Sequence, residues 1–348
     1  MPSGMTQSPE PTSPPATPTS TDVARLAGVS RATVSYVLNA QAAGRVSTRT
    51  QDRVRAAAEE LGYVPHAAAR TLRAGHSGLV LLTTPATPIP RIGALFGDFL
   101  MELQGALHQL GYTSVWHGPV AGAGEQAARA WAELRPAAVL ALPGTGLTPS
   151  AVELLKRSGT RAVLTLGMQP VAGAHALLLD QEMLGARAGT HLLERGRRRI
   201  GVIMPTESGL DLFSVPRLAG VRAAATLETG THVEPLTLDC TEESAAELAA
   251  RWPRLGLDSL FAYNDEYAML VMRAFQDAGL AIPGDLAIVG ADDLLLARLL
   301  RPRLTSVHFD TIPTARIVGL VDRAIREPET APETHQLTRV VVAARDSG

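Results

Sequence analysis

The sequence predicts a small all-α module followed by an α/β body made of two doubly wound lobes. Two observations lead to this fold class. Residues 21–63 carry apolar side chains at helical spacing in three short segments, each bounded by capping residues or a glycine. From residue 77 onwards, short apolar runs alternate with amphipathic helical patterns, which is typical of parallel βαβ units. The chain of 348 residues is long enough for two such lobes.

The segment before the module, residues 1–20, consists almost entirely of Pro, Ser, Thr, Gly and Ala. It has no apolar periodicity and buries too little surface to offset the entropy lost on ordering, so we expect a disordered tail. Three helices are predicted within residues 21–64, each starting at a short polar residue and ending at a glycine or asparagine. The predicted starts and ends are Thr21 or Ser20 and Gly28 for the first helix, Ser30 and Asn39 for the second, and Ser47 or Thr48 and Gly62 for the third.

The body is predicted to span residues 77–345. Nine apolar runs are its expected strands: Leu79–Thr83, Thr113–Trp116, Ala138–Leu142, Arg161–Leu166, Ala176–Leu179, Ile200–Met204, Ser259–Ala262, Leu286–Val289 and Thr305–His308. We expect an N-lobe of about 77–179 plus 307–327 and a C-lobe of about 180–306 plus 328–345. Residues 65–76, which begin with a proline, form the connection to the module.

The net charge of −2 conceals an asymmetry between these parts. Residues 21–76 hold eight arginines and four acidic residues, a local net charge of +4, while residues after 76 carry a net charge of −5. A small basic module on an acidic body indicates a polyanionic partner, although ordinary surface charge is the alternative.

Several classes of protein are excluded by composition. No apolar run is long enough to span a membrane, and the N-terminus lacks the basic start and apolar core of a secretory signal, so we expect a cytoplasmic protein. A single cysteine, Cys240, excludes an internal disulfide framework and a cysteine-based zinc cluster.

The second predicted helix has two distinct faces. Apolar side chains point inward, whereas five side chains share an exposed stripe: Arg31, Ala32, Ser35, Tyr36 and Asn39. Such a helix matches the DNA major groove, where Arg31 can bind the O6 and N7 of guanine and Ala32 can contact a thymine methyl group. Three nearby hydroxyls are suited to phosphates: Ser30, Thr33 and Thr48. A plain solvated helix is the alternative.

Seven short motifs mark residues 21–76: Asp22-Val23-Ala24, Ala27-Gly28-Val29-Ser30, Thr33-Val34-Ser35, Val37-Leu38-Asn39, Arg45-Val46-Ser47, Leu61-Gly62-Tyr63 and Pro65. With them the chain resembles the DNA-binding headpiece of the lactose-repressor/galactose-repressor (LacI/GalR) family of bacterial transcription regulators. The resemblance continues more loosely to about residue 345. It implies a helix-turn-helix headpiece, a body like that of periplasmic binding proteins, and a homodimer on a pseudo-palindromic operator.

The resemblance also implies a hinge helix in residues 65–76, which folds on DNA and pairs with its twin. Leu72 matches the leucine that enters the minor groove, and Ala69 matches the small residue where the twin helices approach. An isolated helix of this length is marginal in water, so its folding can be coupled to binding. Ordinary linker packing of Leu72 is the alternative.

In the body, the resemblance places three residues at effector-binding positions: Arg217, Asn264 and Asp292. Their segments lie at or just after predicted strand ends, where a doubly wound lobe presents its ligand crevice. Guanidinium, amide and carboxylate groups suit a hydroxylated ligand, so we expect a sugar or a related metabolite as the effector. The alternative is that Arg217 and Asp292 form a structural pair.

Two other classes of protein share features with this sequence. Residues 122–127 match the G-x-G-x-x-A pattern of a dinucleotide-binding dehydrogenase, but no acidic residue ends the following strand. No close metal spacing of histidines and no G-x-S-x-G elbow occurs, so we expect no enzyme, no cofactor and no metal. A periplasmic solute receptor would share the body but have no use for residues 21–76. The sequence therefore predicts a nucleoid-associated repressor without a membrane partner, regulated allosterically by its effector.

Overall fold

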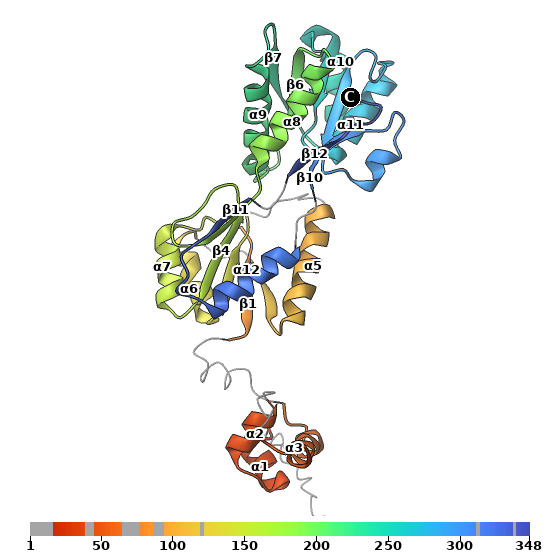
Figure 1. Cartoon of the computed structure of the whole chain (residues 1–348). Coiled ribbons are helices and arrows are strands. Elements are labelled where there is room, and N and C mark those ends of the chain that lie inside the picture. The colour runs from red at the N-terminus through yellow and green to blue at the C-terminus, as the bar shows by residue number, and fades with distance from the viewer. Residues whose placement is uncertain are drawn as a thin grey trace, which may run out of the picture. The chain divides into compact units, whose positions relative to one another are not determined.

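The computed structural model describes residues 17–38, 45–64, 77–85, 94–118, 122–310, 314–336 and 339–348. The chain forms two compact units that divide after Ala74. The described part of the first unit folds as α1 (Ser20–Ala27), α2 (Arg31–Leu38) and α3 (Thr48–Glu60). Small apolar side chains from all three helices form its core: Val23, Ala24, Ala27, Val34, Val37, Val54, Ala57 and Ala58. Figure 1 shows the three helices packed together.

Three predicted helix boundaries are confirmed and one differs, while the predicted end of α2, Asn39, lies outside the described residues. Ser30 and Ser47 each accept a hydrogen bond from the backbone N–H three residues on, as expected for N-caps of α2 and α3. Gly28, in the left-handed region at φ +62°, ends α1. However, α1 is capped by Thr19 instead of Ser20 or Thr21, because the Asp22 carboxylate accepts the Thr19 backbone N–H (2.9 Å) and hydroxyl (2.7 Å).

The first lobe of the second unit contains a six-stranded sheet in the order β11-β5-β4-β3-β1-β2, with all its pairings parallel. Its strands are β1 (Leu79–Thr83), β2 (Thr113–His117), β3 (Ala138–Ala141), β4 (Ala162–Gly167), β5 (His175–Leu178) and β11 (Thr334–Gln336). One face is covered by α5 (Ala94–Gln109) and α12 (Thr314–Arg326), and the other by α6 (Glu125–Glu133) and α7 (Pro149–Arg157).

The second lobe repeats this plan in the order β12-β10-β9-β8-β6-β7, with β12 antiparallel to β10. Its strands are β6 (Arg199–Pro205), β7 (His232–Leu238), β8 (Ser259–Phe261), β9 (Ala287–Ala291), β10 (Thr305–Phe309) and β12 (Val340–Ala343). Its helices are α8 (Gln181–Glu194) and α9 (Asp211–Ala225) on one face, α10 (Glu242–Leu255) and α11 (Asp265–Asp277) on the other, and the short 3-10 helix η1 (Leu295–Arg298). The predicted fold class, with two doubly wound lobes, is confirmed.

The predicted lobe boundaries are wrong in the last third of the chain. β10 pairs with β9, so the second lobe continues to residue 309 and does not give way to the first lobe at 307. β11 lies in the first sheet although 328–345 was assigned to the C-lobe. This strand has three polar residues, Thr-His-Gln, and therefore lacks the apolar run that identifies a buried strand. The edge strand β7 was missed because most of its side chains are polar or partly exposed.

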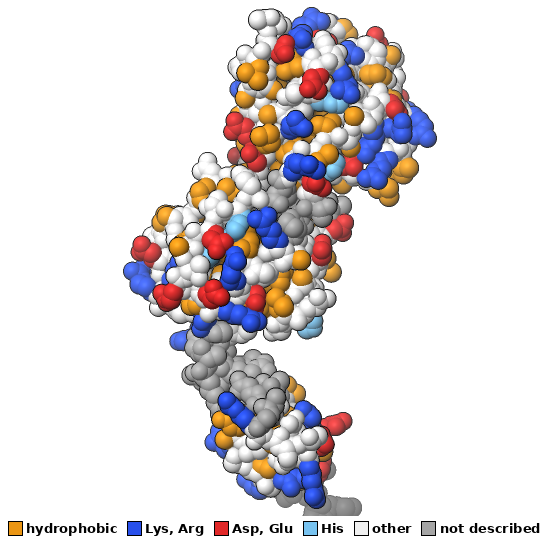
Figure 2. All heavy atoms as spheres, viewed as in Figure 1, with side chains coloured by type: hydrophobic (Ala, Val, Ile, Leu, Met, Phe, Trp, Pro, Cys, Tyr) orange, Lys and Arg blue, Asp and Glu red, His pale blue; other side chains and the backbone are white. Residues whose placement is uncertain are grey.

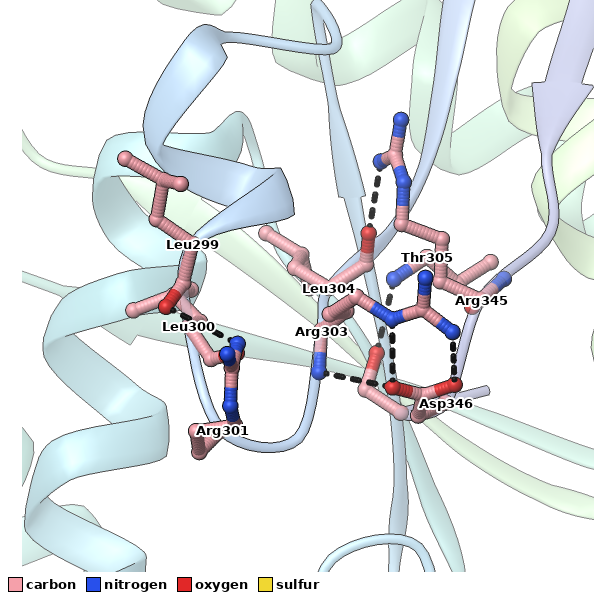
Figure 3. Close-up of polar contacts among 9 residues, drawn as sticks. Leu299, Leu300, Arg301, Arg303, Leu304, Thr305, Arg345 and Asp346 are labelled. Atoms are coloured by element: carbon pink, nitrogen blue, oxygen red, sulfur yellow. Dashed lines mark hydrogen bonds and ion pairs between the residues drawn. The ribbon is translucent and has the colours of Figure 1, made fainter.

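Residues 346 and 347 are hydrogen-bonded to the second lobe. Ser347 is fully buried, donates its hydroxyl to the Ile288 carbonyl (2.6 Å) and accepts the Thr305 N–H (2.9 Å). Arg303 donates three hydrogen bonds to Asp346, two from its guanidinium (2.8 and 3.0 Å) and one from its backbone N–H (3.3 Å), as Figure 3 shows. In the described segments, no helix combines the length and the apolar character needed to cross a membrane.

Candidate functional site

The predicted recognition stripe of α2 lies on the surface of the first unit. Arg31 and Ala32 are exposed, the Tyr36 side chain is 38% exposed and Ser35 is half-buried. On the opposite side of the helix, Val34 and Val37 are buried in the core. The helix therefore has the two faces that its sequence predicts.

The three predicted phosphate-binding hydroxyls lie at the starts of two helices. Ser30 Oγ is 3.1 Å from the Thr33 backbone nitrogen and 2.9 Å from the Thr33 hydroxyl, so both hydroxyls belong to the cap of α2. Thr48 is the exposed first residue of α3. Helix N-termini attract anions through their free N–H groups and positive dipole ends, so these positions suit DNA phosphates.

The charge of this unit is unevenly neutralised. Arg25 pairs with Asp22 (3.2 Å) and Arg55 pairs with Asp52 (3.5 Å). Four further exposed arginines form no ion pair with another described residue: Arg31, Arg45, Arg49 and Arg53. Blue side chains predominate over red on the visible face of this unit in Figure 2. Such a surface favours contact with a polyanion.

One arginine near the stripe was missed as a site residue. The Arg45 guanidinium lies 5.6 Å from the ring centroid of Tyr36, a cation–π arrangement that orients the tyrosine on the stripe. Only the fold brings these residues together. Three predicted DNA-binding residues lie outside the described residues: Asn39, Ala69 and Leu72.

In the second lobe, the order β7-β6-β8-β9-β10 places the topological switch point between β6 and β8. A doubly wound sheet presents its ligand crevice at the carboxyl ends of the strands beside this point. Asn264 follows β8 and Asp292 follows β9, so both predicted residues lie at that edge. Arg217 comes from α9 and approaches the same edge from the face of the sheet.

Arg217 is buried and held by two hydrogen bonds. Its Nε donates to Gln181 Oε1 (2.9 Å), its Nη1 donates to the Tyr263 carbonyl, and its guanidinium lies 4.9 Å from the centroid of the Tyr263 ring. Its Nη2 is 4.0 Å from Asp292 Oδ1. This separation is within ion-pair range but too long for a hydrogen bond. Arg217 and Asp292 therefore attract each other without forming the hydrogen-bonded structural pair that was the alternative to a binding role.

The position of Arg217 depends on a close contact between α8 and α9. A Cβ atom at Gly185 would lie 1.9 Å from the Arg217 carbonyl oxygen, and one at Gly220 would lie 1.9 Å from the Glu182 carbonyl oxygen. Only glycine allows the two backbones to approach so closely. The contact brings Gln181, at the start of α8, within reach of Arg217.

Asp292 combines an unusual backbone with a largely buried side chain. Its φ is +93° and that of Asp293 is +50°, a conformation that costs of the order of 1 kcal/mol or more for a non-glycine residue and gathers at functional sites. Burial raises the pKa of the Asp292 carboxyl, and the nearby Arg217 opposes this effect. The same burial raises the pKa of Tyr263 to about 12, so this hydroxyl stays protonated at neutral pH.

Asn264 has a role in addition to the predicted one. It is buried, and its Oδ1 accepts the Tyr267 N–H (3.0 Å), which caps α11. Its side-chain NH₂ group and the second lone pair of its Oδ1 remain for a ligand. Sequence reasoning missed Glu207, which follows β6 and accepts the Tyr267 hydroxyl, because no motif marks it. Within the described segments, no group of three His, Cys, Asp or Glu side chains is arranged to hold a metal ion.

Comparison with known proteins agrees with this architecture. Residues 19–66 match the model "Bacterial regulatory proteins, lacI family", and residues 190–347 match that of a periplasmic binding protein-like domain. Residues 19–66 thus form a lacI-family domain. The predicted family, and the helix-turn-helix headpiece on a periplasmic-binding-protein-like body, are therefore confirmed.

The similarity to curated lacI-family relatives covers most of the chain. The ribose operon repressor of Escherichia coli K12 is 29% identical over 333 residues, which cover 92% of this chain and 97% of that protein. The HTH-type transcriptional repressor PurR of Vibrio atlanticus is 28% identical, covering 82% of this chain and 85% of that protein. These relatives are transcriptional repressors, so the prediction of a DNA-binding regulator, not an enzyme, is confirmed.

Two solved structures of lacI-family members resemble the whole chain. The regulator CelR in complex with cellobiose has a TM-score of 0.60 at 26% identity, covering 95% of this chain and all of that one. The lac repressor dimer bound to operator and the anti-inducer ONPF has a TM-score of 0.73 at 23% identity, covering 94% and 97%.

Proposed function

We propose that this lacI-family protein represses transcription in the bacterial cytoplasm by binding a pseudo-palindromic operator as a homodimer under the control of a small-molecule effector. The exposed stripe on α2 carries this proposal. It presents Arg31 to a major groove, while the bonded hydroxyls at the starts of α2 and α3 contact phosphates. Ala69 and Leu72 are proposed to engage the minor groove between the two half-sites.

The DNA-binding proposal is tested by selecting sites from a library of inverted repeats with the full-length protein. Arg31→Ala is expected to weaken binding by about 1–3 kcal/mol and to relax the preference at one base pair of each half-site. The matched control is Arg55→Ala, which removes the same charge from an exposed residue of α3 that pairs with Asp52 (3.5 Å). Failure to select any repeat, or equal loss of base preference in both variants, contradicts the proposal.

The effector is proposed to be a sugar or a related hydroxylated metabolite. Arg217 Nη2 and Asp292 Oδ1 lie 4.0 Å apart, so one ligand hydroxyl can accept from the guanidinium and donate to the carboxylate, with both bonds near 2.8 Å. Glu207 and Asp292 add negative charge at this edge, whereas Arg217 is already hydrogen-bonded. This balance favours a ligand rich in hydroxyl donors over an anion.

The effector proposal is tested with D-ribose and cellobiose as probes. We expect at least one of them to alter operator binding by the wild-type protein. Asp292→Asn removes the anionic acceptor with little change in shape, so operator binding should persist while the response to the probe is lost. A normal response in this variant means that the effector site lies elsewhere.

The homodimer is proposed to form partly through the edge of the second lobe that carries η1. Three leucines there are exposed by 53–71%: Leu295, Leu296 and Leu299. Gln276 donates to the Arg301 carbonyl (2.7 Å), which joins this segment to α11. Helices α10 and α11 also border a groove of about 630 Å³, lined by the apolar side chains of Ala246, Met269, Leu270 and Ala274 and the charged side chains of Glu242, Glu266, Arg273 and Asp277. Basic side chains (blue) and hydrophobic side chains (orange) lie together at the edge of this lobe in Figure 2.

The exposed leucines of one copy can pack against the apolar lining of this groove in another copy, and a twofold axis repeats that contact in both directions. Leu299→Glu is therefore expected to shift the protein towards monomers in sedimentation analysis and to weaken operator binding. Leu227→Glu is the control, since Leu227 is 85% exposed beyond the end of α9. An unchanged dimer in the Leu299 variant removes this face from the proposal.

A further inference from the structure

A buried carboxylate lies directly beneath the loop that carries Asp292. Asp265 is the first residue of α11 and its side chain is completely buried. Its Oδ1 accepts the Ser306 hydroxyl (2.7 Å) and its Oδ2 accepts the Leu294 N–H (2.7 Å). Burying a carboxylate costs substantial desolvation free energy. Because the hydrogen bonds of Asp265 go to Ser306 in β10 and to the Leu294 amide in the loop, we infer that this cost is offset by holding the loop against the sheet.

Three consecutive amides of this loop are fixed by hydrogen bonds. The Asp292 N–H donates to the Val307 carbonyl (2.9 Å), the Asp293 N–H donates to Ser306 Oγ (3.0 Å), and the Leu294 N–H donates to Asp265. Ser306 thus accepts from the loop and donates to Asp265. The positive φ values occur at the first two of these residues, so the bonds hold the segment that would otherwise relax.

The sheet leaves space for the buried carboxylate at one position. A Cβ atom on Gly290, in β9, would lie 2.2 Å from Asp265 Oδ1 and 3.0 Å from a methyl carbon of Leu304. Any larger residue there would displace the Asp265 side chain. Gly290, two residues before Asp292, is therefore part of the same arrangement.

We propose that Asp265 is a positioning residue of the effector site, which acts through Ser306 and the Leu294 amide to hold the Asp292–Asp293 backbone in the left-handed conformation that directs the Asp292 carboxylate towards Arg217. The side chain of Asp293 is anchored separately, by Arg298 (3.0 Å) and Arg345 (2.5 Å). Asp265 thus controls the backbone of the loop. That the loop serves an effector rests on the function proposed above.

Three substitutions test this role by different routes: Asp265→Asn removes the anionic acceptor, Ser306→Ala removes the bridging hydroxyl, and Gly290→Ala displaces the carboxylate without removing a polar group. The control is Asp258→Asn. Asp258 precedes β8 at the opposite end of the strand from Asp265 and also accepts backbone amides, those of Arg198 (3.0 Å) and Arg199 (3.1 Å). Asp258→Asn therefore removes a carboxylate that binds backbone amides in the same lobe but far from the 292–294 loop.

Hydrogen exchange of the full-length protein is the first measurement. In the three test variants, exchange of the Asp293 and Leu294 amides is expected to accelerate at least about tenfold, because hydrogen bonds to charged or bridging groups are lost. In the control, exchange should accelerate at residues 198–199 and remain unchanged at 292–294. Wild-type exchange at 293–294 in Asp265→Asn overturns the proposal.

Binding of D-ribose and cellobiose is the second measurement. A probe that binds the wild-type protein should bind Asp265→Asn at least about tenfold more weakly. Asp258→Asn should keep the wild-type affinity even where its melting temperature falls as much as that of Asp265→Asn. Equal losses in these two variants reduce Asp265 to a general stabilising residue and overturn its positioning role. If neither probe binds the wild-type protein, the proposed sugar effector fails, but the exchange measurement still decides whether Asp265 holds the loop.

Discussion

The second lobe is expected to lose stability as the pH rises from about 5 to 7, because of Asp265. Burial raises the pKa of its carboxyl to about 7, with smaller contributions from Asp292 and Asp293, against a value of 3.8 for an unperturbed carboxyl. Between these two values the native protein binds more protons than the unfolded chain. The free energy of unfolding therefore decreases as the pH rises through this window and levels off above it.

The size of the effect follows from the two pKa values. Each tenfold change in proton affinity corresponds to about 1.4 kcal/mol, so the complete difference between the two states is about 4 kcal/mol. Roughly 2 kcal/mol of this is lost between about pH 5 and pH 7, since titration of the unfolded carboxyl is nearly complete at the start of that interval.

The assay is urea unfolding of the full-length wild-type protein and of Asp265→Asn across this range, followed by tryptophan fluorescence, to which Trp252, buried in the same lobe, contributes. Asparagine does not titrate, so the stability difference between the two proteins should change by about 2 kcal/mol in favour of the variant as the pH rises from about 5 to 7. A difference that is constant across the range refutes the reasoning.

Two further predictions concern the packing around the site. Gly220→Ala places a methyl group against the α8 backbone and is expected to lower the free energy of unfolding by about 1–3 kcal/mol, measured by urea unfolding. Arg345→Gln should cost roughly 3 kcal/mol because Asp293 is only 10% exposed, whereas Arg303→Gln should cost at most about 1 kcal/mol because its pair with Asp346 is half exposed. Equal costs for the two arginine variants would contradict the assigned burial.

The headpiece could be predicted from the sequence because its signals are local. A serine or threonine before each helix, a glycine after α1, and valines at helical spacing define the three helices within twenty to forty residues. Even the exception is local: Thr19 caps α1 because Asp22 lies three residues on, a pairing available to neither Ser20 nor Thr21. The alternation of strands and helices in the body could also be predicted, because buried parallel strands are continuous apolar runs in the sequence.

The remaining features depend on contacts between distant segments. β11 has no apolar run, and its pairing with β5 is decided by how the chain returns to the first sheet after α12. Arg217 and Asp292 were found through the family resemblance, but the bonds of Arg217 to Gln181 and to the Tyr263 carbonyl were not. Neither was the link between Ser306 and Asp265, which lie 41 residues apart. Nothing in the spacing of these residues shows that they meet.

A short path connects the proposed effector site to the proposed dimer face. Asp292 and the first exposed leucine, Leu295, are three residues apart, and the ion pair between Asp293 and Arg298 (3.0 Å) ties the loop to η1. Because hydrogen bonds and ion pairs join residues 292–298 to one another and to their anchors, a ligand that displaces Asp292 is expected to displace the exposed leucines with it. An effector that binds one position of this segment better than another then shifts the equilibrium between the two. Coupling of this kind needs no long chain of residues, since one segment carries both contacts.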